Sequence, residues 1–357
     1  MPVAAKKVRV AVVGASGYSG EELVRLLLAH PHVELCALTS RQYAGKPLSQ
    51  VLPWFAGHPA AKSLRFTDST PEHLMASASV VFLALPHGVA AEFARPLLDG
   101  GCKVIDLSAD FRLRSADVYQ QFYGQAHPAP DLLAEAVYGL PEVHAAAIRN
   151  ARLVASPGCY PTSVLLPLLP LLREGLVKPT GIIATSLSGV SGAGRKAELP
   201  YLFVECNESA RPYSVPRHRH LSEMEQELSA AAGLPVLMQF TPHLIPMSRG
   251  ILTTLHLAPA QHFNTELEMA ELAARITRCY HNAYEHAPFV RLLCGDALPD
   301  TKQVARTNFL DLAWRLDPRT GRLLVMSAID NIVKGAGGQA VQSLNLICGF
   351  EETAGLL

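Results

Sequence analysis

The sequence has no long uninterrupted apolar run. Its longest apolar stretch, residues 164–172, is shorter than the roughly 20 residues that a membrane-spanning helix needs, and it contains Pro167 and Pro170. The first residues include no extended apolar segment of the kind found in secretory signals. We therefore expect a soluble, cytoplasmic protein.

An excess of charge of one sign is also missing. The 31 basic side chains balance the 31 acidic ones, and no block of like charge occurs. This pattern argues against a nucleic-acid groove and against an anionic membrane surface as partners. We expect small-molecule partners instead.

The seven cysteines lack the short pair spacings of a disulfide framework or a zinc site. We expect their thiols to be reduced, and the sequence predicts no metal. At 357 residues, the chain is longer than a comfortable single core, which favours two domains.

One cysteine lies in an unusual local sequence. Cys159 follows a strand-like run that stops at Pro157-Gly158, and it precedes a leucine-rich segment that is predicted to be helical from near Pro161. The positive end of a helix dipole lowers a thiol pKa toward neutrality, which makes the thiolate available as a nucleophile. A buried core cysteine is the alternative, because free cysteines are among the most buried residue types.

A glycine loop near the start of the chain follows an apolar strand predicted over residues 8–13. Residues 14–20 read Gly-Ala-Ser-Gly-Tyr-Ser-Gly, and a helical run of residues 21–30 comes next. Small residues in a strand–loop–helix unit let the backbone approach a pyrophosphate at the helix N-terminus. The pattern predicts a dinucleotide site, and a plain tight turn is the alternative.

The end of the second predicted strand, residues 33–38, carries no acid. Thr39-Ser40-Arg41 stands where an NAD-specific enzyme usually has a carboxylate for the ribose hydroxyls. A hydroxyl followed by an arginine suits a ribose 2′-phosphate, so the sequence favours NADP(H). A solvated surface arginine is the alternative.

Two further strands are predicted in this half, over residues 79–85 and 103–107. The first ends at Pro86-His87-Gly88, and its carboxyl end is expected to face the cofactor. The second leads into a polar corner that contains Asp110 and Arg112. Arg112 is either an anion ligand or the partner of Asp110 in a structural ion pair.

The second half of the chain has a different pattern. A small-residue loop, residues 188–196, ends in Arg195-Lys196 and offers backbone donors and charge to a phosphate or carboxylate. His218 and His220 lie two residues apart, so in an extended segment both would project toward one site. Exposed side chains in a basic turn are the alternative.

Strands are predicted in this half over residues 182–187, 236–240, 251–257, 308–316 and 322–329, with an amphipathic helix over residues 266–283. They indicate a broad, partly antiparallel sheet with helices. The last segment, residues 330–338, opens an apolar helix that runs to Cys348.

Taken together, these blocks closely resemble the N-acetyl-γ-glutamyl-phosphate reductases, a family of the semialdehyde dehydrogenase superfamily. The resemblance spans nearly the whole chain, and two small departures from the family pattern are Ser248 and Gly337. The blocks that carry it are residues 14–20, 85–88, 106–112, 138–142, 156–162, 188–196, 218–220 and 334–336.

The resemblance implies an α/β Rossmann domain with a doubly wound, mostly parallel sheet, formed by residues 1–158 and 331–357. An inserted α+β domain of glyceraldehyde-3-phosphate-dehydrogenase-like type, residues 159–330, would carry substrate contacts and a subunit interface. Under this resemblance, the catalytic residues are Cys159, His220 and His218; the cofactor-binding residues are Gly14, Ser16, Gly17, Tyr18, Ser19, Gly20, Ser40, Arg41, Pro86, His87, Ser188, Gly189 and Asn331; and the substrate-binding residues are Arg112, Ser156, Arg195, Lys196 and His218.

The implied chemistry is an NADPH-dependent reduction of an acyl phosphate through a Cys159 thioester, within arginine biosynthesis. We expect a homo-oligomer, either a dimer or a tetramer. Between the two histidines, His220 is favoured as the proton-handling partner because it adjoins the start of a predicted helix. An aspartate-semialdehyde dehydrogenase, a reductase of the aminoadipate homologue and a non-catalytic NADP-sensing module remain alternatives.

Overall fold

The computed structural model describes residues 7–357, and the chain divides into two compact units. The first consists of the chain up to Pro157 together with Ala336–Leu357, and the second is Gly158–Gly335.

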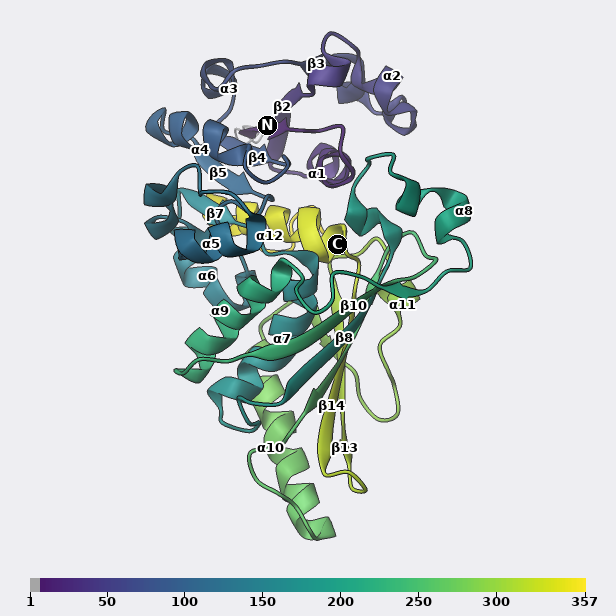
Figure 1. The fold of residues 1–357 in the computed structure, drawn as a ribbon. Coiled ribbons are helices and arrows are strands. Elements are labelled where there is room, and N and C mark those ends of the chain that lie inside the picture. The colour runs from purple at the N-terminus through teal and green to yellow at the C-terminus, as the bar shows by residue number, and fades with distance from the viewer. Residues whose placement is uncertain (1–6) are drawn as a thin grey trace, which may run out of the picture. The chain divides into compact units, whose positions relative to one another are not determined.

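The first unit is built on a seven-stranded sheet whose strands pair in parallel, with the order β3-β2-β1-β4-β5-β7-β6 (Figure 1). The chain leaves β1 toward β2 on one side and later returns to β4 on the other, so the carboxyl end of β1 is the switch point of the sheet. Ligands of such sheets bind at this point. The strands are β1 (Val8–Val13), β2 (Val33–Thr39), β3 (Phe66–Thr67), β4 (Val80–Leu83), β5 (Lys103–Asp106), β6 (Val137–Tyr138) and β7 (Leu153–Ala155).

Helices cover this sheet, and one of them comes from the end of the chain. Helix α12 (Gly338–Cys348) is buried along nearly its whole length and packs against α1, α6 and β5, as the family resemblance implied. The helix mixes apolar and polar residues, and two of its buried polar side chains, Gln342 and Asn345, donate hydrogen bonds to Glu142 and to the backbone carbonyl of Glu352. The other helices are α1 (Tyr18–Ala29), α2 (Leu48–Val51), α3 (Pro71–Ser77), α4 (Ala90–Asp99), α5 (Ala116–Tyr123) and α6 (Pro141–Arg149).

The second unit contains a mixed seven-stranded sheet, with the order β12-β13-β14-β11-β8-β10-β9. Strands β8, β10 and β11 alternate between buried and more exposed side chains, which is typical of a sheet covered on one face. The strands are β8 (Ile182–Ser188), β9 (Arg211–Pro212), β10 (Met238–Leu244), β11 (Ile251–Leu257), β12 (Val290–Leu292), β13 (Leu310–Asp317) and β14 (Arg322–Ile329).

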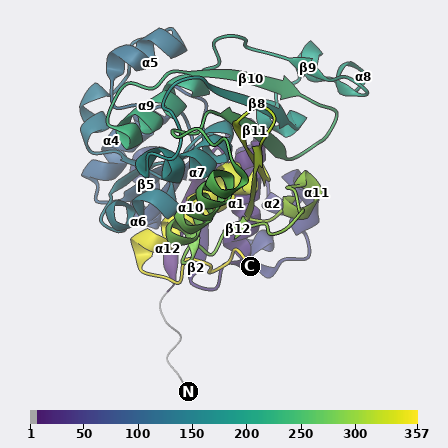
Figure 2. The same ribbon diagram turned by 90° about the horizontal axis from the view of Figure 1, so that it is seen from below.

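Helices α7, α9 and α10 pack on one side of this sheet (Figures 1 and 2). Helix α7 is almost wholly buried, although it contains Pro167 and Pro170. Its neighbour α10 begins with a capping box formed by Thr265 and Glu268. The helices of this unit are α7 (Cys159–Arg173), α8 (Phe203–Cys206), α9 (His220–Ala232), α10 (Glu266–Tyr284) and α11 (Thr301–Val304).

Some element boundaries differ from those predicted. The strand expected over residues 236–240 is β10, which starts at Met238 and continues to Leu244 because it pairs in parallel with all of β8. The last helix is preceded by a π-helical turn, Val333–Gly337. Within residues 7–357, no helix is both long enough and apolar enough to span a bilayer.

Candidate functional site

Cys159 is the first residue of α7, so the helix starts two residues earlier than the sequence indicated. Gly158 is the N-cap residue and has no side chain that could accept a hydrogen bond from the first turn. The Cys159 side chain therefore lies at the positive end of the α7 dipole, a position that favours a thiolate. The thiol is partly buried, and within residues 7–357 no cysteine forms a disulfide.

A buried carboxylate fixes the turn before Cys159. Glu223, on the first turn of α9, has an exposed fraction of only 1%. Its Oε1 accepts a hydrogen bond of 2.8 Å from the backbone N–H of Gly158. Helix α9 thereby holds the N-cap residue directly before α7.

The His220 ring lies against the same turn. A Cβ atom built on Gly158 would come within 2.6 Å of His220 Nε2, so only glycine allows the imidazole to approach this closely. His220 is the first residue of α9, three positions before Glu223, and both side chains therefore lie on the same side of that helix. The structure thus brings Gly158, His220 and Glu223 together beside Cys159.

His218 occupies a different setting. The segment around it is a turn and not the extended strand that was expected: Arg219 has φ −57° and ψ −33°, and Leu221 N–H donates to His218 O. The two histidine rings are nevertheless 4.9 Å apart between centroids. The His218 ring also packs against the aromatic rings of Tyr160, Tyr213 and Phe240.

Burial in this aromatic cluster lowers the pKa of His218 to about 4, and the positive charge of Arg219 adds to the effect. Its Nδ1 accepts a hydrogen bond from the backbone N–H of His220, so the remaining ring proton of the neutral form sits on Nε2. A neutral imidazole brings no positive charge to a substrate anion. The expected role of His218 as a ligand of substrate anions stays a prediction, in which the neutral ring would act as a hydrogen-bond donor through Nε2.

The π-helical turn packs against the cysteine from another side. A Cβ atom built on Gly335 would lie 2.7 Å from the Cβ atom of Cys159. Asp330, which is completely buried, holds this turn by accepting hydrogen bonds from the backbone N–H groups of Ile332 and Val333. The glycine in the Lys-Gly-Ala block is thus required by its contact with Cys159.

The small-residue loop after β8 is anchored by Asn331. Asn331 Oδ1 accepts a 2.7 Å hydrogen bond from Gly250 N–H, and its Nδ2 donates to Ser191 Oγ at 3.0 Å. Gly189 is needed here because a Cβ atom would come within 2.8 Å of Ser248 O. Asn331 therefore positions the loop that contains Ser188 and Gly189.

The two cations at the end of this loop, Arg195 and Lys196, are exposed. His218 is buried, and its expected role in substrate binding together with Arg195 and Lys196 stays a prediction.

In the first unit, the glycine loop joins β1 to α1 through closely packed glycine positions. Gly14 has φ +79°, and a Cβ atom on it would lie 2.3 Å from Ala84 O. A Cβ atom on Gly20 would lie 2.3 Å from Gly14 O. Helix α1 starts directly after Gly17 and has no side-chain cap, so the backbone N–H groups of Tyr18 and Ser19 lie in its first turn, where an anion binds.

The end of β2 contacts this loop. Ser16 Oγ and Ser40 Oγ are 2.9 Å apart, and Arg41 follows with its side chain 80% exposed. Asp68, from the segment after β3, has Oδ1 3.9 Å from Arg41 Nε. An acidic side chain therefore lies near Arg41. It comes from the segment after β3, so the sequence at the end of β2 could not reveal it.

The remaining predicted residues of this unit are near other strand ends. Pro86 and His87 are exposed after β4. Arg112 donates from Nε to Ser156 O at 2.8 Å and from Nη2 to Leu107 O at 2.8 Å, so it braces the backbone after β7. The hydroxyl of Ser156 is buried and has no hydrogen-bond partner in the described chain, which leaves it available to a ligand.

Asp110 has other partners than Arg112. It accepts hydrogen bonds from the N–H groups of Gly88 and Ala91 and from the hydroxyl of Tyr119. Burial raises the pKa of the adjacent Asp106 to about 7, and the nearby Asp110 charge contributes. The polar corner is thus mainly a brace between β4, β5 and α4.

Comparisons with known proteins assign the chain. Residues 9–151 match the family described as semialdehyde dehydrogenase, NAD binding domain, and residues 159–331 match semialdehyde dehydrogenase, dimerisation domain. The N-acetyl-gamma-glutamyl-phosphate reductase of Akkermansia muciniphila is 58% identical over 98% of this chain and 99% of its own length. The enzyme of the same name from Moorella thermoacetica is 50% identical over 98% of both chains.

The chain belongs to the N-acetyl-γ-glutamyl-phosphate reductase family. It is an NAD(P)-dependent oxidoreductase. Members of this reductase family share their fold with more distant enzymes: aspartate semialdehyde dehydrogenase II of Vibrio cholerae has a TM-score of 0.71 at 19% identity, over 97% of this chain and 99% of that chain. The aspartate semialdehyde dehydrogenase of Candida albicans, whose structure contains NADP, has a TM-score of 0.68 at 16% identity, over 96% of this chain and 99% of that chain.

The candidate site includes two residues to which the sequence assigned no role, Glu223 and Gly335. A signal for Glu223 was present, since a carboxylate three positions after His220 on a helix shares its face. Gly335 had no such signal, because its neighbour Cys159 is far away in the sequence.

In the part of the chain that the structure describes, no group of three or more His, Cys, Asp or Glu side chains could hold a metal ion.

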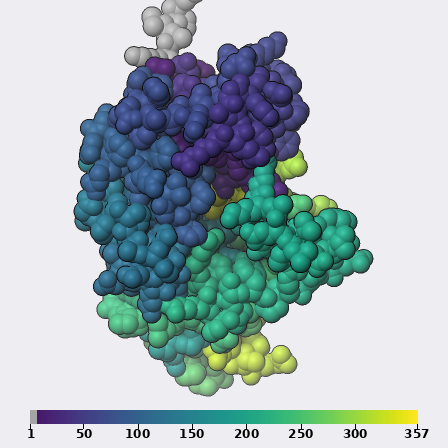
Figure 3. All heavy atoms as spheres, turned by 45° about the horizontal axis from the view of Figure 1, so that its top comes forward, coloured from purple at the N-terminus to yellow at the C-terminus, as the bar shows by residue number. Residues whose placement is uncertain are grey.

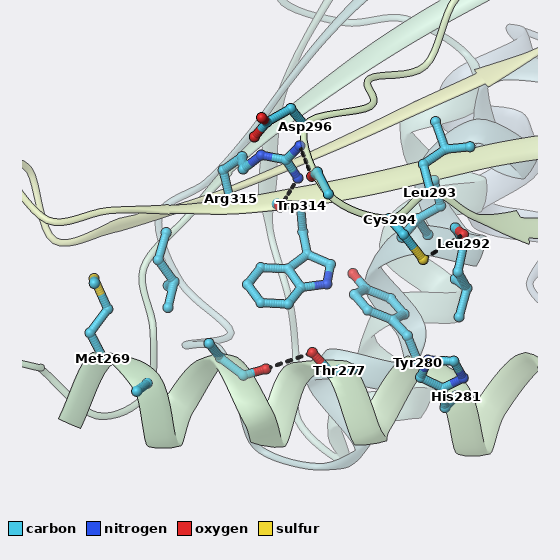
Figure 4. Close-up of a pocket in the computed structure, with 15 residues that line it drawn as sticks. Met269, Thr277, Tyr280, His281, Leu292, Leu293, Cys294, Asp296, Trp314 and Arg315 are labelled. Atoms are coloured by element: carbon cyan, nitrogen blue, oxygen red, sulfur yellow. Dashed lines mark hydrogen bonds between the residues drawn. The ribbon is translucent and has the colours of Figure 1, made fainter. Parts of the chain in front are cut away.

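A pocket of about 590 Å³ lies elsewhere in the second unit, between α10 and β13. Figure 4 shows the Trp314 indole facing the helix, with Tyr280 and Met269 on the opposite wall and Arg315 above. None of the predicted catalytic residues lines this pocket.

Proposed function

We propose that the protein reduces N-acetyl-γ-glutamyl phosphate with NADPH, forming N-acetylglutamate 5-semialdehyde and inorganic phosphate, as a step of arginine biosynthesis in the cytoplasm. The observation that carries this proposal is the position of Cys159 at the start of α7, with the His220 ring against the preceding glycine. The high identity to enzymes of that name over the full length supports the choice of substrate.

The proposed reaction starts when His220 accepts the proton of the Cys159 thiol. The thiolate attacks the acyl carbon, a C–S bond forms, and the C–O bond to phosphate breaks with its electron pair leaving on phosphate, which takes the proton back from His220. The product on the enzyme is a thioester. Bound NADPH supplies a hydride to this acyl group. The resulting tetrahedral adduct expels the Cys159 thiolate, which releases the aldehyde and regains a proton from solvent.

The N-terminus of α7 supports both thiolate states of this cycle. The positive end of its dipole stabilises negative charge on the Cys159 sulfur before the attack and after the release. Glu223 and Gly335 act as positioning residues, since they fix the turn and the Cβ environment of Cys159 without contacting the substrate in this scheme.

For the cofactor, we assign the pyrophosphate to the glycine loop and the first turn of α1. The tight approaches of Gly14 and Gly20 fit this role. We assign the 2′-phosphate of NADPH to Ser40 and Arg41, where a hydroxyl and an exposed guanidinium follow β2. The exposed Pro86 and His87, and the loop with Ser188 and Gly189, complete the proposed contacts.

For the substrate, we assign a contact to the buried Ser156 hydroxyl, which lacks a partner in the described chain. Arg195 and Lys196 are proposed to bind the anionic groups of the substrate, because both side chains are exposed. Arg112 is proposed to hold the Ser156 backbone in place. We also propose that copies of the chain associate as a dimer or tetramer, consistent with the matched dimerisation domain.

The test is an assay of phosphate-dependent oxidation of three semialdehydes, those of N-acetylglutamate, aspartate and N-acetylaminoadipate, with NADP⁺. We expect kcat/KM to be highest for N-acetylglutamate semialdehyde. A higher value for either competitor would move the protein to a related reductase activity. No turnover of any of them, with cofactor binding intact, would favour a non-catalytic NADP-binding module.

A further inference from the structure

Asp110 lies behind the segment that follows β4 in the first unit, and its side chain is completely buried. Its Oδ1 accepts a 2.6 Å hydrogen bond from the backbone N–H of Gly88, and its Oδ2 accepts one of 3.3 Å from the N–H of Ala91. Gly88 belongs to residues 84–88, which we call the β4 loop, and Ala91 belongs to the first turn of α4. One buried carboxylate therefore holds the β4 loop and the start of α4 together.

The β4 loop packs directly on the glycine loop. The N–H of Ala84 donates to Val13 O at 2.9 Å, and a Cβ atom on Gly14 would lie 2.3 Å from Ala84 O. The strands that carry the two loops, β1 and β4, are neighbours at the switch point of the sheet. In Figure 3, the blue part of the first unit adjoins its purple N-terminal part. The β4 loop is therefore a neighbour of the segment assigned to the pyrophosphate.

The order of the strands decides which half of a dinucleotide the β4 loop would meet. The first turn of α1, where the pyrophosphate is assigned, follows β1, which has β2 on one side and β4 on the other. The adenosine half is assigned to the β2 side, where Ser40 and Arg41 follow the strand. The nicotinamide half then extends toward the end of β4, because a dinucleotide lies across the switch point of such a sheet.

Asp110 is itself fixed from β5 and α5. Its backbone N–H donates to Ser108 Oγ at 3.0 Å, and this hydroxyl donates to Asp106 Oδ2 at the end of β5. Tyr119 of α5, which is completely buried, donates its hydroxyl to Asp110 Oδ1 at 3.0 Å. A buried network whose members are hydrogen-bonded is rigid, so the position of the Asp110 carboxylate determines the position of the Gly88 N–H.

Helix α5 supports the same loop through a second contact. The Tyr123 ring lies 5.5 Å from the His87 ring between centroids, and it stacks on the Tyr119 ring at 4.7 Å. Tyr119 is also the residue that donates to Asp110. Asp110 and the two tyrosines thus support the β4 loop from one side, and the loop exposes Pro86 and His87.

We propose that Asp110 is a positioning residue for the nicotinamide half of NADPH and acts by holding the β4 loop through the N–H of Gly88. Asp110 is buried and does not contact the cofactor in this scheme. Its removal would take the acceptor from the N–H groups of Gly88 and Ala91 and would release the loop. This inference rests on the proposed cofactor site and is independent of the proposed acyl chemistry.

The test compares two ligands by isothermal titration calorimetry, with full-length protein and without substrate. NADPH carries both halves of the cofactor, whereas adenosine 2′,5′-bisphosphate carries only the half assigned to the β2 side. Asp110→Ala is expected to raise the Kd of NADPH about 10- to 100-fold, as the loss of a hydrogen bond to a charged group does, and to change the Kd of adenosine 2′,5′-bisphosphate by less than about twofold. A role in stability alone would not separate the two ligands.

Three further variants separate this effect from lost stability. Ile148→Ala removes a completely buried side chain of α6, which packs against α12 and β6, and is expected to lower the melting temperature while both Kd values stay near those of the wild type. Tyr119→Phe leaves both backbone donors on the carboxylate, so we expect little change in either Kd. Asp110→Asn keeps one acceptor oxygen and is expected to raise the Kd of NADPH by about three- to tenfold.

The proposal is overturned if Asp110→Ala binds NADPH as tightly as the wild type does, or if both ligands lose affinity by the same factor. Should Asp110→Ala fail to fold, Asp110→Asn decides: a raised ratio of the two Kd values supports the proposal, and the wild-type ratio contradicts it. A wild-type protein that does not bind NADPH contradicts this inference and the proposed function together. A wild-type protein that binds NADPH but oxidises none of the three semialdehydes contradicts the proposed reaction alone.

Discussion

Glu223 Oε1 accepts a 2.8 Å hydrogen bond from the backbone N–H of Gly158, the residue directly before Cys159. Glu223 is buried, so a substitution that removes its carboxylate leaves a buried amide without this partner. Glu223→Ala is expected to lower kcat by roughly 10- to 100-fold, which corresponds to the 1.5–3 kcal/mol typical of a hydrogen bond to a charged group.

Glu223→Gln serves as the matched variant for this prediction. Its amide oxygen can still accept the Gly158 hydrogen bond, so we expect it to retain most of the activity that Glu223→Ala loses. Steady-state kinetics of both variants, with the rate of Cys159 alkylation as a second readout, measure the effect. Equal activity of Glu223→Ala and the wild type would remove Glu223 from the account.

Gly335→Ala tests the contact between the π-helical turn and the nucleophile. The added methyl group would lie 2.7 Å from the Cβ atom of Cys159, which is shorter than carbon atoms approach, so Cys159 must move. We expect kcat to fall by about 100-fold, since small misplacements of reacting groups have effects of this size. Gly57→Ala is the control, because nothing lies within 4 Å of a Cβ atom there.

The two histidines are expected to differ in their kinetic roles. His220→Asn should mainly depress kcat and flatten its pH profile, because His220 lies against the turn before Cys159. His218→Asn should affect folding stability more than proton transfer, since its ring is buried among aromatic side chains. Swapped kinetic phenotypes would require the roles to be exchanged.

The pH dependence of stability provides a separate readout for His218. Burial lowers its pKa in the folded protein to about 4, below the unfolded value of 6.5, so the unfolded chain binds the extra proton between these values. Its contribution to the free energy of unfolding is therefore fully present above pH 6.5 and is lost as the pH falls toward 4. The full loss is on the order of 3 kcal/mol, and the difference between wild type and His218→Asn should show it in denaturant titrations.

The preference for NADPH over NADH is expected to be about tenfold or greater, equivalent to roughly 1.4 kcal/mol. Arg41→Ala should narrow this preference for NADPH. Asp68→Asn should widen it by about two- to threefold, because an exposed carboxylate near Arg41 competes weakly for the guanidinium. Ratios of kcat/KM for the two cofactors measure both effects. An unchanged ratio in Arg41→Ala would place the 2′-phosphate elsewhere, for instance near Lys46.

The fold could be predicted largely from local patterns. Apolar runs followed by glycine or proline, such as those before Gly14 and Pro86, marked β1 and β4 within two residues, whereas the two-residue strands β3 and β6 were not predicted. The second half was harder because the order of its strands depends on long-range pairing. Thus β10 was placed too early, as its length follows from β8 and not from its own sequence.

The candidate site was predictable where one short segment carries the signal, as at Cys159. It was not predictable where two distant segments meet. Asp68 lies beside Arg41 and Gly335 packs against Cys159 only because the chain folds back. The properties of His218 were also hidden, because its environment is made by Tyr160, Tyr213 and Phe240 from different elements.

The central claim is that Cys159 forms a covalent acyl intermediate. The most direct measurement mixes the enzyme with N-acetyl-γ-glutamyl phosphate in the absence of NADPH and follows phosphate release on a rapid timescale. We predict a burst of about one phosphate per active site, an increase in intact protein mass by one acyl group, and neither signal in Cys159→Ser. Turnover of Cys159→Ser near the wild-type rate, or phosphate release from the wild-type enzyme without acylation, would contradict the account.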